Sequence, residues 1–173
     1  MKQFVILLAL PLLSSLALLS GCGLRPVYAG GASGATATFL NSVAVQPIAG
    51  GRTGWLMRAA LADRIGEPRG DERYRLEVEV DDDLTGFGIR GDTAVTRERR
   101  TIRARYRLVN NATGQVVLDA TAGSDAGIDV VSSDVATLAA EQTAAERLAQ
   151  VVADQIVGRL SLYAGRSPAA GAR

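Results

Sequence analysis

Apolar and polar residues alternate strictly along residues 74–80, and they alternate again from Ile102 to Leu108 within a second stretch, residues 96–110. The apolar positions are Tyr74, Leu76, Val78 and Val80 in the first stretch and Ile102, Ala104, Tyr106 and Leu108 in the second. Because successive side chains of a strand point to opposite faces, both stretches predict half-buried strands. The polar sequence at residues 110–114 predicts a hairpin turn, and residues 116–120 predict a returning strand.

Helical spacing of apolar residues appears in two other stretches. Residues 53–65 predict a helix with Thr53 as its N-cap and with Gly66 and Pro68 as its stop. Residues 132–163 predict a long final helix, because two serines and an aspartate open it and one apolar stripe runs along its length.

The segment before the first helix predicts a first strand. Residues 39–48 carry Val43 and Val45 at alternate positions and lead to a Gly-Gly pair at residues 50–51. Trp55, near the start of the helix, is expected in the core, with a contact at a lipid edge as the alternative.

The order of these elements, β-α-β-β-β-α, predicts the fold class α+β. We expect a two-layer sandwich in which two helices pack on one face of a four-stranded, mostly antiparallel sheet. The other face of that sheet is left without a covering layer from this chain, which suggests a partner.

The N-terminal residues predict export and lipid attachment. Lys2 and an apolar core over residues 4–19 form a signal peptide of residues 1–21, too short for a membrane-spanning helix. Leu19-Ser20-Gly21-Cys22 has the pattern of a lipobox, which predicts acylation of Cys22; the alternative is a plain secretory peptide with a cysteine there by accident. Acyl chains would hold the domain at a membrane without a spanning helix.

The rest of the chain divides by composition. Residues 22–37, rich in Gly, Ala and Ser, predict a lipidated N-terminus and a flexible tether. A single α+β domain is expected over residues 38–163, followed by a tail of residues 164–173. The residue after Cys22 is Gly23 and not aspartate, which resembles lipoproteins sent to the outer membrane, so we expect the periplasmic side of that membrane.

Composition narrows the function classes. The chain has 19 basic and 18 acidic residues, and Lys2 is its only lysine, so the exported part is formally neutral and nucleic-acid binding is not expected. Histidine is absent and Cys22 is the only cysteine. This removes His-based catalysis, thiol nucleophiles, nitrogen- or sulfur-ligated metals and disulfides. We therefore expect a binding protein with no catalytic residues, no metal and no cofactor.

Arginines gather on one face of the predicted strand at residues 96–110. They are Arg97, Arg99, Arg103, Arg105 and Arg107, which the alternation places away from the core. If this strand pairs with residues 74–80, Glu77 and Glu79 can lie opposite Arg105 and Arg103, and Asp119 can lie opposite Arg105. Arg97, Arg99 and Arg100 lie toward the end of the strand where the supply of carboxylates depends on register, and this end is either an anion-binding patch or a solvated face. Arg97, Arg99, Arg103 and Arg105 are the candidate phosphate-binding residues.

Three successive aspartates, at residues 81–83, follow the first alternating stretch. They lack the glycine and the distal glutamate of a helix-loop-helix calcium motif, so solvation at the sheet edge is the better interpretation. Residues 86–92 predict a bend or the end of a hairpin. A hydrolase that uses Glu77, Glu79 or these aspartates is a weaker alternative, because no spaced acid and nucleophile stand out.

Several blocks of the sequence together resemble the LPS-assembly lipoproteins of the LptE family, alphaproteobacterial members above all. The blocks are Gly21–Tyr28 at the anchor, Thr96-Arg97 entering a strand that reaches Tyr106-Arg107-Leu108, and the final helix from Ala136 to Leu160. Their order and spacing span most of the exported chain. The resemblance implies a two-helix, four-stranded α+β sandwich, which agrees with the element order.

The resemblance also implies a function without catalysis. Such a lipoprotein plugs the lumen of an outer-membrane β-barrel LPS-assembly protein, helps the barrel to assemble, and binds lipopolysaccharide for insertion at the cell surface. Arg97 matches the Thr-Arg pair of the family, whereas the other arginines follow from the alternation. An accessory lipoprotein of an ABC-type lipid transport system is the alternative function.

Overall fold

The computed structural model describes residues 34–67, 70, 72–89 and 95–166. The elements are α2 (Ala35–Leu40), β1 (Val43–Val45), α3 (Gly51–Ile65), β2 (Tyr74–Ile89), β3 (Val95–Asn110), β4 (Val116–Asp129) and α4 (Asp134–Arg166). The strands form one sheet in the order β1-β2-β3-β4, in which β1 runs parallel to β2 and the other pairs are antiparallel. The predicted α+β class is confirmed, with the short helix α2 added to the two expected helices.

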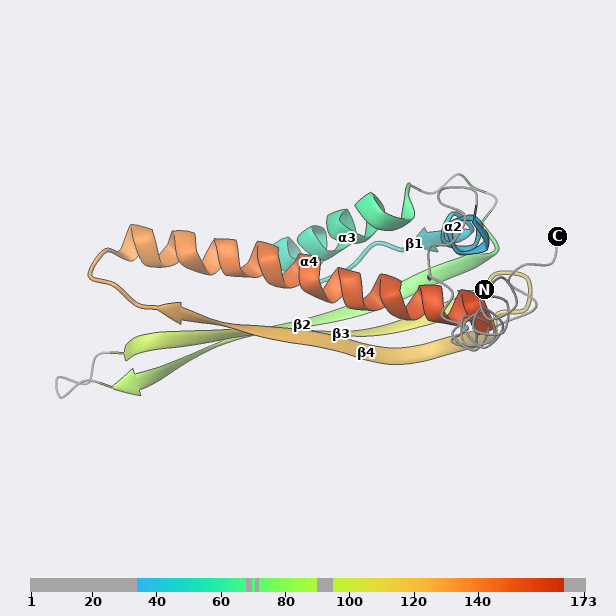
Figure 1. Cartoon of the computed structure of the whole chain (residues 1–173). Coiled ribbons are helices and arrows are strands. Elements are labelled where there is room, and N and C mark those ends of the chain that lie inside the picture. Colours follow the sequence, from blue (N-terminus) through green and yellow to red (C-terminus); the bar gives the residue numbers. More distant parts are fainter. Residues whose placement is uncertain (1–33, 68–69, 71, 90–94, 167–173) are drawn as a thin grey trace, which may run out of the picture.

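The described part of the chain forms two layers (Figure 1). The helices lie on one side of the sheet, and α4 runs along most of its length. The alternation of β2 and β3 turns their apolar positions toward this side. The largest fully buried apolar side chains are Phe39, Met57, Leu61, Leu76, Ile102, Leu108, Ile156, Leu160 and Val152. The core therefore lies between the sheet and α3 and α4, as the period of two predicts.

The predicted first strand is mostly wrong. Only Val43–Val45 form a strand, while Phe39 belongs to α2. The ring of Phe39 packs between Tyr74 and Tyr163, with centroid distances of 5.4 and 5.8 Å. Pro47, which has no N–H to donate, follows β1 closely. The predicted domain limits at residues 37/38 and 163/164 fall inside α2 and α4.

The start of α3 also differs from the prediction. The helix begins at Gly51, and its N-cap is Gly50 with a φ of 110°, so Thr53 is not the cap. Thr53 is buried in the first turn, where its hydroxyl donates to Asp82 Oδ2 at 2.5 Å. Trp55 is 66% exposed and not part of the core, because the buried stripe of α3 runs through Met57 and Leu61.

The β2–β3 hairpin and β4 are longer than predicted. Strand β2 continues through the three aspartates and through residues 86–88, which the sequence suggested as a bend or the end of a hairpin; there is no bend at these residues, and β2 pairs with β3 as far as Ile89. Strand β4 extends to Asp129 rather than ending near residue 120. Alternation persists along the added length, so Asp82 faces the helices and is not an edge residue in solvent.

Asp82 forms a half-buried ion pair that ties four elements together. Arg100 Nε and Nη2 donate to its two carboxylate oxygens at 2.9 and 2.6 Å. Arg100 Nη1 also donates to the backbone carbonyl of Glu141 in α4 at 3.1 Å. With Thr53 as a further donor from α3, the Asp82 carboxylate connects both long helices to β2 and β3. Burial opposes its ionisation, but the hydrogen bonds from Arg100 and Thr53 outweigh burial and hold the pKa of Asp82 below its usual value.

The packing becomes thinner toward the end where α4 begins. Residues 134–143 of α4 include no buried side chain, and Ala144 is the first one to be buried. Leu84, on the helix side of β2, is 42% exposed. Nearby, Glu98 Oε2 is buried without a hydrogen-bond partner, and burial together with the Glu141 carboxylate raises the pKa of Glu98. This end of the molecule therefore has an incomplete apolar layer.

Truncating the centre of the core should destabilise the protein strongly. Leu76 and Leu108 are paired across β2 and β3 and are fully buried, so Leu76→Ala or Leu108→Ala should lower the free energy of unfolding by about 2–5 kcal/mol. Urea unfolding followed by circular dichroism measures this change. Leu138→Ala is the matched control, because Leu138 is 53% exposed and its loss should cost less than about 0.5 kcal/mol. Equal losses at all three positions would contradict the assigned core.

Removing the charge of Asp82 should destabilise the protein in a pH-dependent way. Asp82→Asn should lower the free energy of unfolding by about 1.5–3 kcal/mol at pH 7, since charge-assisted hydrogen bonds are lost. Because the folded pKa of Asp82 is depressed, this stabilisation is present above the unfolded pKa and is lost as pH falls through the folded value. The wild-type advantage should therefore hold from pH 7 to about 5 and shrink below about pH 4.

Urea titrations at several pH values measure this difference. Asp83→Asn is the matched control, because Asp83 is the next residue and is exposed. A constant difference down to pH 2 would show that the charge of Asp82 is not the cause.

Candidate functional site

The face of the sheet opposite the helices carries the predicted arginines. The side chains of Arg97, Arg99, Arg103 and Arg105 are exposed on β3, whereas the intervening apolar residues are buried. Carboxylates border this row on both sides: Glu77, Glu79, Asp81 and Asp83 on β2, and Asp119, Asp125 and Asp129 on β4. The site is therefore a basic row between two acidic rows, and not a uniformly basic patch. No described residue covers it.

The register of the β2–β3 hairpin differs by two residues from the pairing that the sequence suggested, in which Glu77 and Glu79 lie opposite Arg105 and Arg103. Glu77 lies opposite Arg107, and Glu79 lies opposite Arg105. A shift of two residues keeps every side chain on its own face, so the hydrophobic pattern alone did not distinguish the two registers. On the other side of β3, Asp119 is the partner of Arg107 in register, although its carboxylate bonds to Arg105.

Most of the predicted arginines already have a carboxylate partner. Arg105 donates to both oxygens of Asp119, from Nε at 3.2 Å and from Nη2 at 2.9 Å. The hydrogen bond from Arg105 lowers the pKa of Asp119. Arg97 bonds to Asp129 at 3.0 Å. These pairs are exposed, so solvent screens them and a competing anion can exchange for the carboxylate at little cost.

Arg99 has a looser environment. Its Nε lies 3.8 Å from the Asp125 carboxylate, beyond hydrogen-bond distance. Its guanidinium carbon lies 5.5 Å from the centre of the Phe87 ring, which is 39% exposed on the same face. The ring supports the guanidinium by a cation–π contact and leaves its N–H groups available.

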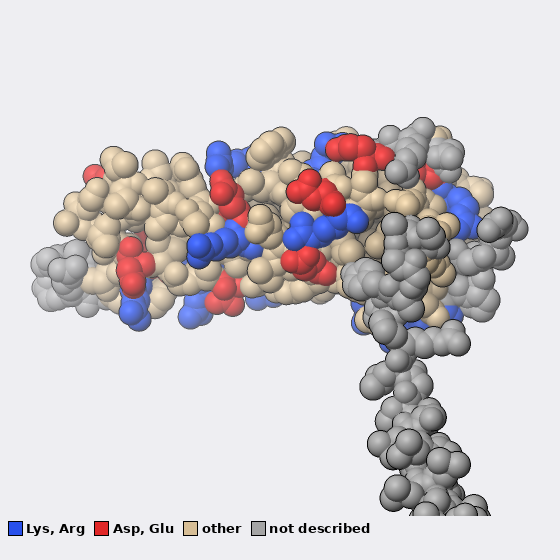
Figure 2. Space-filling model, turned by 45° about the horizontal axis from the view of Figure 1, so that its top comes forward, with Lys and Arg blue, Asp and Glu red and all other residues tan. Residues whose placement is uncertain are grey.

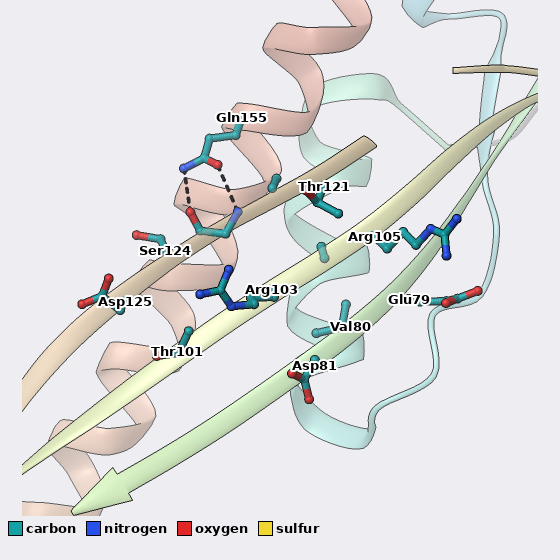
Figure 3. A pocket seen from close by; sticks show the side chains of 13 residues that line it. Glu79, Val80, Asp81, Thr101, Arg103, Arg105, Thr121, Ser124, Asp125 and Gln155 are labelled. Carbon is teal, nitrogen blue, oxygen red and sulfur yellow. Dashed lines mark hydrogen bonds between the residues drawn. The ribbon is translucent and has the colours of Figure 1, made fainter. Parts of the chain in front are cut away.

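Arg103 has no carboxylate within 4.0 Å among the described residues. Its partners in register are Asp81 on β2 and Gly123 on β4. Figure 3 shows its guanidinium directed from β3 toward β4, away from Asp81. Gly123 has no side chain, and a Cβ there would lie 3.4 Å from Arg103 Cγ, so the glycine leaves space for the arginine. Arg103 can therefore offer its planar set of donors to an anion without first breaking an ion pair.

A depression of about 650 Å³ surrounds Arg103. Its lining includes Glu79, Thr101, Arg105, Thr121 and Ser124, with Gln155 reaching in from α4 (Figure 3). The amide of Gln155 makes two hydrogen bonds to the backbone of Gly123, at 3.2 and 3.3 Å. These bonds fix the position of β4 beside Arg103.

The structure separates the arginines that the sequence grouped together. Three of the four candidates have a carboxylate within 4.0 Å, and Arg103 stands apart as the one without. Arg100, which the sequence placed at the possible anion-binding end, points to the helix side and is held by Asp82. Sequence reasoning missed the role of Gly123, although a lone glycine inside a strand often marks a close approach of other atoms. Cys22 lies outside the described residues.

Within residues 34–67, 70, 72–89 and 95–166, no group of His, Cys, Asp and Glu side chains is arranged to hold a metal ion. No helix in these same residues combines the length and the apolar character needed to cross a membrane.

Comparison with solved structures places the fold among bacterial lipoproteins. A lipoprotein from Caulobacter crescentus is similar over 78% of this chain and 99% of its own, with 26% identity and a TM-score of 0.62. A minor lipoprotein from Acinetobacter baumannii matches 70% of this chain and 90% of its own, with 12% identity and a TM-score of 0.55. The rare lipoprotein B from Shewanella oneidensis matches 70% and 94%, with 9% identity and a TM-score of 0.53. The last two similarities show the fold alone.

Comparison by sequence identifies a family. No curated protein matches the chain. The family model for lipopolysaccharide assembly, LptE, matches residues 40–160, which include β1 to β4, α3 and most of α4. The chain therefore belongs to the LptE family of lipopolysaccharide-assembly proteins.

Proposed function

We propose that this protein is an outer-membrane lipoprotein that plugs and helps to assemble a β-barrel translocon and binds lipopolysaccharide for insertion at the cell surface. The observation that carries the proposal is the charged face of the sheet, which no described residue covers, in a chain of this family. The role is one of binding and positioning, without catalysis.

Membrane attachment through Cys22 is the first part of the proposal. Acyl chains on its thiol and on the new amino terminus would hold the protein on the periplasmic side of the outer membrane. More than one chain is needed for stable attachment, because a single chain binds a bilayer only marginally.

Contact with the barrel is the second part. The end of the molecule where α4 begins is mostly free of charge in Figure 2, whereas charged side chains gather over the middle. At that end Val131, Val135 and Leu138 are 49%, 79% and 53% exposed. An apolar surface of this kind suits a protein partner. A plug needs contacts on several sides, and this end and the charged sheet face together provide them.

Binding of lipopolysaccharide is the third part. Lipid A carries phosphates, and the planar guanidinium group matches phosphate oxygens in a bidentate way. Arg103 would receive a phosphate first, since it has no carboxylate to release. Arg99, and then Arg97 and Arg105, could add contacts along the row by exchanging exposed carboxylates for phosphate. The flanking acidic rows would confine the anion to the row of arginines.

Membrane fractionation followed by affinity purification tests the anchor and the partner together. The wild-type protein should sediment with the outer membrane on a density gradient, and Cys22→Ala should move to the soluble fraction. After detergent extraction, the wild type should co-purify with a β-barrel protein that shows heat-modifiable migration.

Other results of this experiment would contradict parts of the proposal. Recovery of the wild type with an inner-membrane complex would favour an accessory role in ABC-type lipid transport. An outer-membrane location without any co-purifying barrel would contradict the proposed plug function but would still agree with lipid attachment.

Removal of Arg103 should weaken lipopolysaccharide binding while the domain stays folded. Arg103→Ala deletes the unpaired guanidinium, so the Kd for purified lipopolysaccharide should rise by about tenfold, as for the loss of one charge-assisted bidentate contact. Binding to immobilised lipopolysaccharide measures this effect. Arg58→Ala is the matched control, because Arg58 is a partly exposed arginine on α3, which lies on the helix side of the sheet, and it pairs with Glu67. Equal affinities of the two variants would show that Arg103 is only solvated.

A further inference from the structure

Strand β4 forms an open edge of the sheet, and side chains of α4 cap that edge at two points. At the first, the Gln155 amide accepts from the N–H of Gly123 and donates to its carbonyl oxygen, as a neighbouring strand would (Figure 3). At the second, the N–H of Val131, just after β4, donates to Thr137 Oγ1 at 3.3 Å. Both caps satisfy backbone groups that point away from β3.

The directions of the backbone N–H and C=O groups between the two caps follow from the alternation along a strand. The backbone N–H of Val130 donates to the carbonyl oxygen of Thr96 in β3. The backbone N–H and C=O groups of even-numbered residues of β4 therefore point toward β3, and those of odd-numbered residues point toward the open edge. Asp125, Gly127 and Asp129 therefore present their N–H and C=O groups at the open edge. No described residue bonds to these groups. The open section spans about 27 Å between the caps, which is the length of a short strand.

A groove runs beside this open section, between β4 and α4, with a volume of about 530 Å³. It is lined mainly by small or apolar residues, which include Ala126, Ala140, Ala144, Leu148 and Val151, and Arg147 of α4 is the basic side chain of its lining. Val151 is 43% exposed. An extended segment paired with the edge would turn every second side chain into this groove.

The charges beside the edge indicate which kind of segment fits. Asp125 and Asp129 project from β4 on the outer face of the sheet, on either side of Gly127. Antiparallel pairing of two copies about Gly127 would place Asp125 opposite Asp129, and like charges directly opposite one another destabilise a sheet. A segment with basic side chains at the outer positions would instead continue the arrangement of alternating charges already present across β2, β3 and β4.

We propose that the edge of β4 between Gly123 and Val131 binds an extended segment of a partner protein, with basic side chains at alternate positions facing outward and apolar ones entering the groove beside α4. Gln155 and Thr137 limit the length of the segment, because they occupy the edge at each end. This inference goes beyond the proposed function and does not depend on it.

The test uses a peptide of defined chemistry and the purified protein. The probe is the acetylated and amidated peptide Arg-Val-Arg-Val-Arg-Val-Arg, compared with a version N-methylated on the backbone positions that would face β4. A third peptide has glutamate in place of arginine. Fluorescence polarisation gives the affinities, and amide hydrogen exchange followed by NMR shows which backbone groups become protected.

The expected result is binding of the first peptide, with new protection at Asp125, Gly127 and Asp129. The N-methylated and acidic peptides should bind about tenfold more weakly or not at all. Gly127→Pro should weaken binding by about tenfold, because it removes a donor at the edge where proline is tolerated. Thr121→Pro is the matched control, since it removes an edge donor outside the open section and should leave the affinity unchanged.

Three results would overturn the proposal. One is the absence of binding by the basic peptide at millimolar concentration. Another is equal binding by the N-methylated peptide, or by Gly127→Pro, which would show attraction by charge without pairing to the strand. The third is a dimer in analytical ultracentrifugation that Gly127→Pro abolishes, because the occupant of the edge would then be a second copy.

Discussion

The alternation of side chains along β3 is the constraint on which the rest of the structure depends. One strand supplies Ile102, Tyr106 and Leu108 to the core and a row of arginines to the opposite face. A shift by one residue would bury the arginines and expose the core, so a single choice of face determines both stability and surface chemistry. The hairpin with β2 extends this division over the full length of the molecule.

The surface that results is balanced in charge instead of being strongly basic. Acidic rows on β2 and β4 border the arginines, and most of the resulting ion pairs are exposed. Such a face has a weak field at a distance, because opposite charges alternate within a few ångströms and salt screens what is left. It would recognise an anion through close geometry at Arg103 more than through long-range attraction.

Much of the fold follows from the sequence, because burial of one face imposes a visible period. The three long strands and the long final helix carried such a period, and the turn after Asn110 was predicted from its residue types. The short helix α2 and the position of Trp55 did not, since fewer than two turns of helix are too few to show a pattern and an exposed tryptophan has no sequence signature. The ends of β2 and β4 were underestimated for a related reason: aspartates and glycines interrupt the apolar pattern while the backbone pairing continues.

Only part of the candidate site could be predicted from the sequence. The sequence placed the arginines on one face, but which of them lack a partner depends on register, and a shift of two residues leaves the pattern unchanged. The bonds from Gln155 to Gly123 and from Arg100 to Asp82 join residues 32 and 18 positions apart. Such contacts depend on how α4 and the hairpin come together in three dimensions, which local periodicity does not encode.

The length of α4 sets how far the two ends of the molecule lie apart. Its 33 residues measure about 50 Å along the axis, which exceeds the roughly 30 Å hydrocarbon thickness of a bilayer. The first described residues of the chain lie in α2, which packs against the last turns of this helix, while the exposed apolar end lies at its start. A molecule tethered beside α2 would thus act as a rigid spacer, able to hold its far tip a full membrane's depth away from the point of attachment.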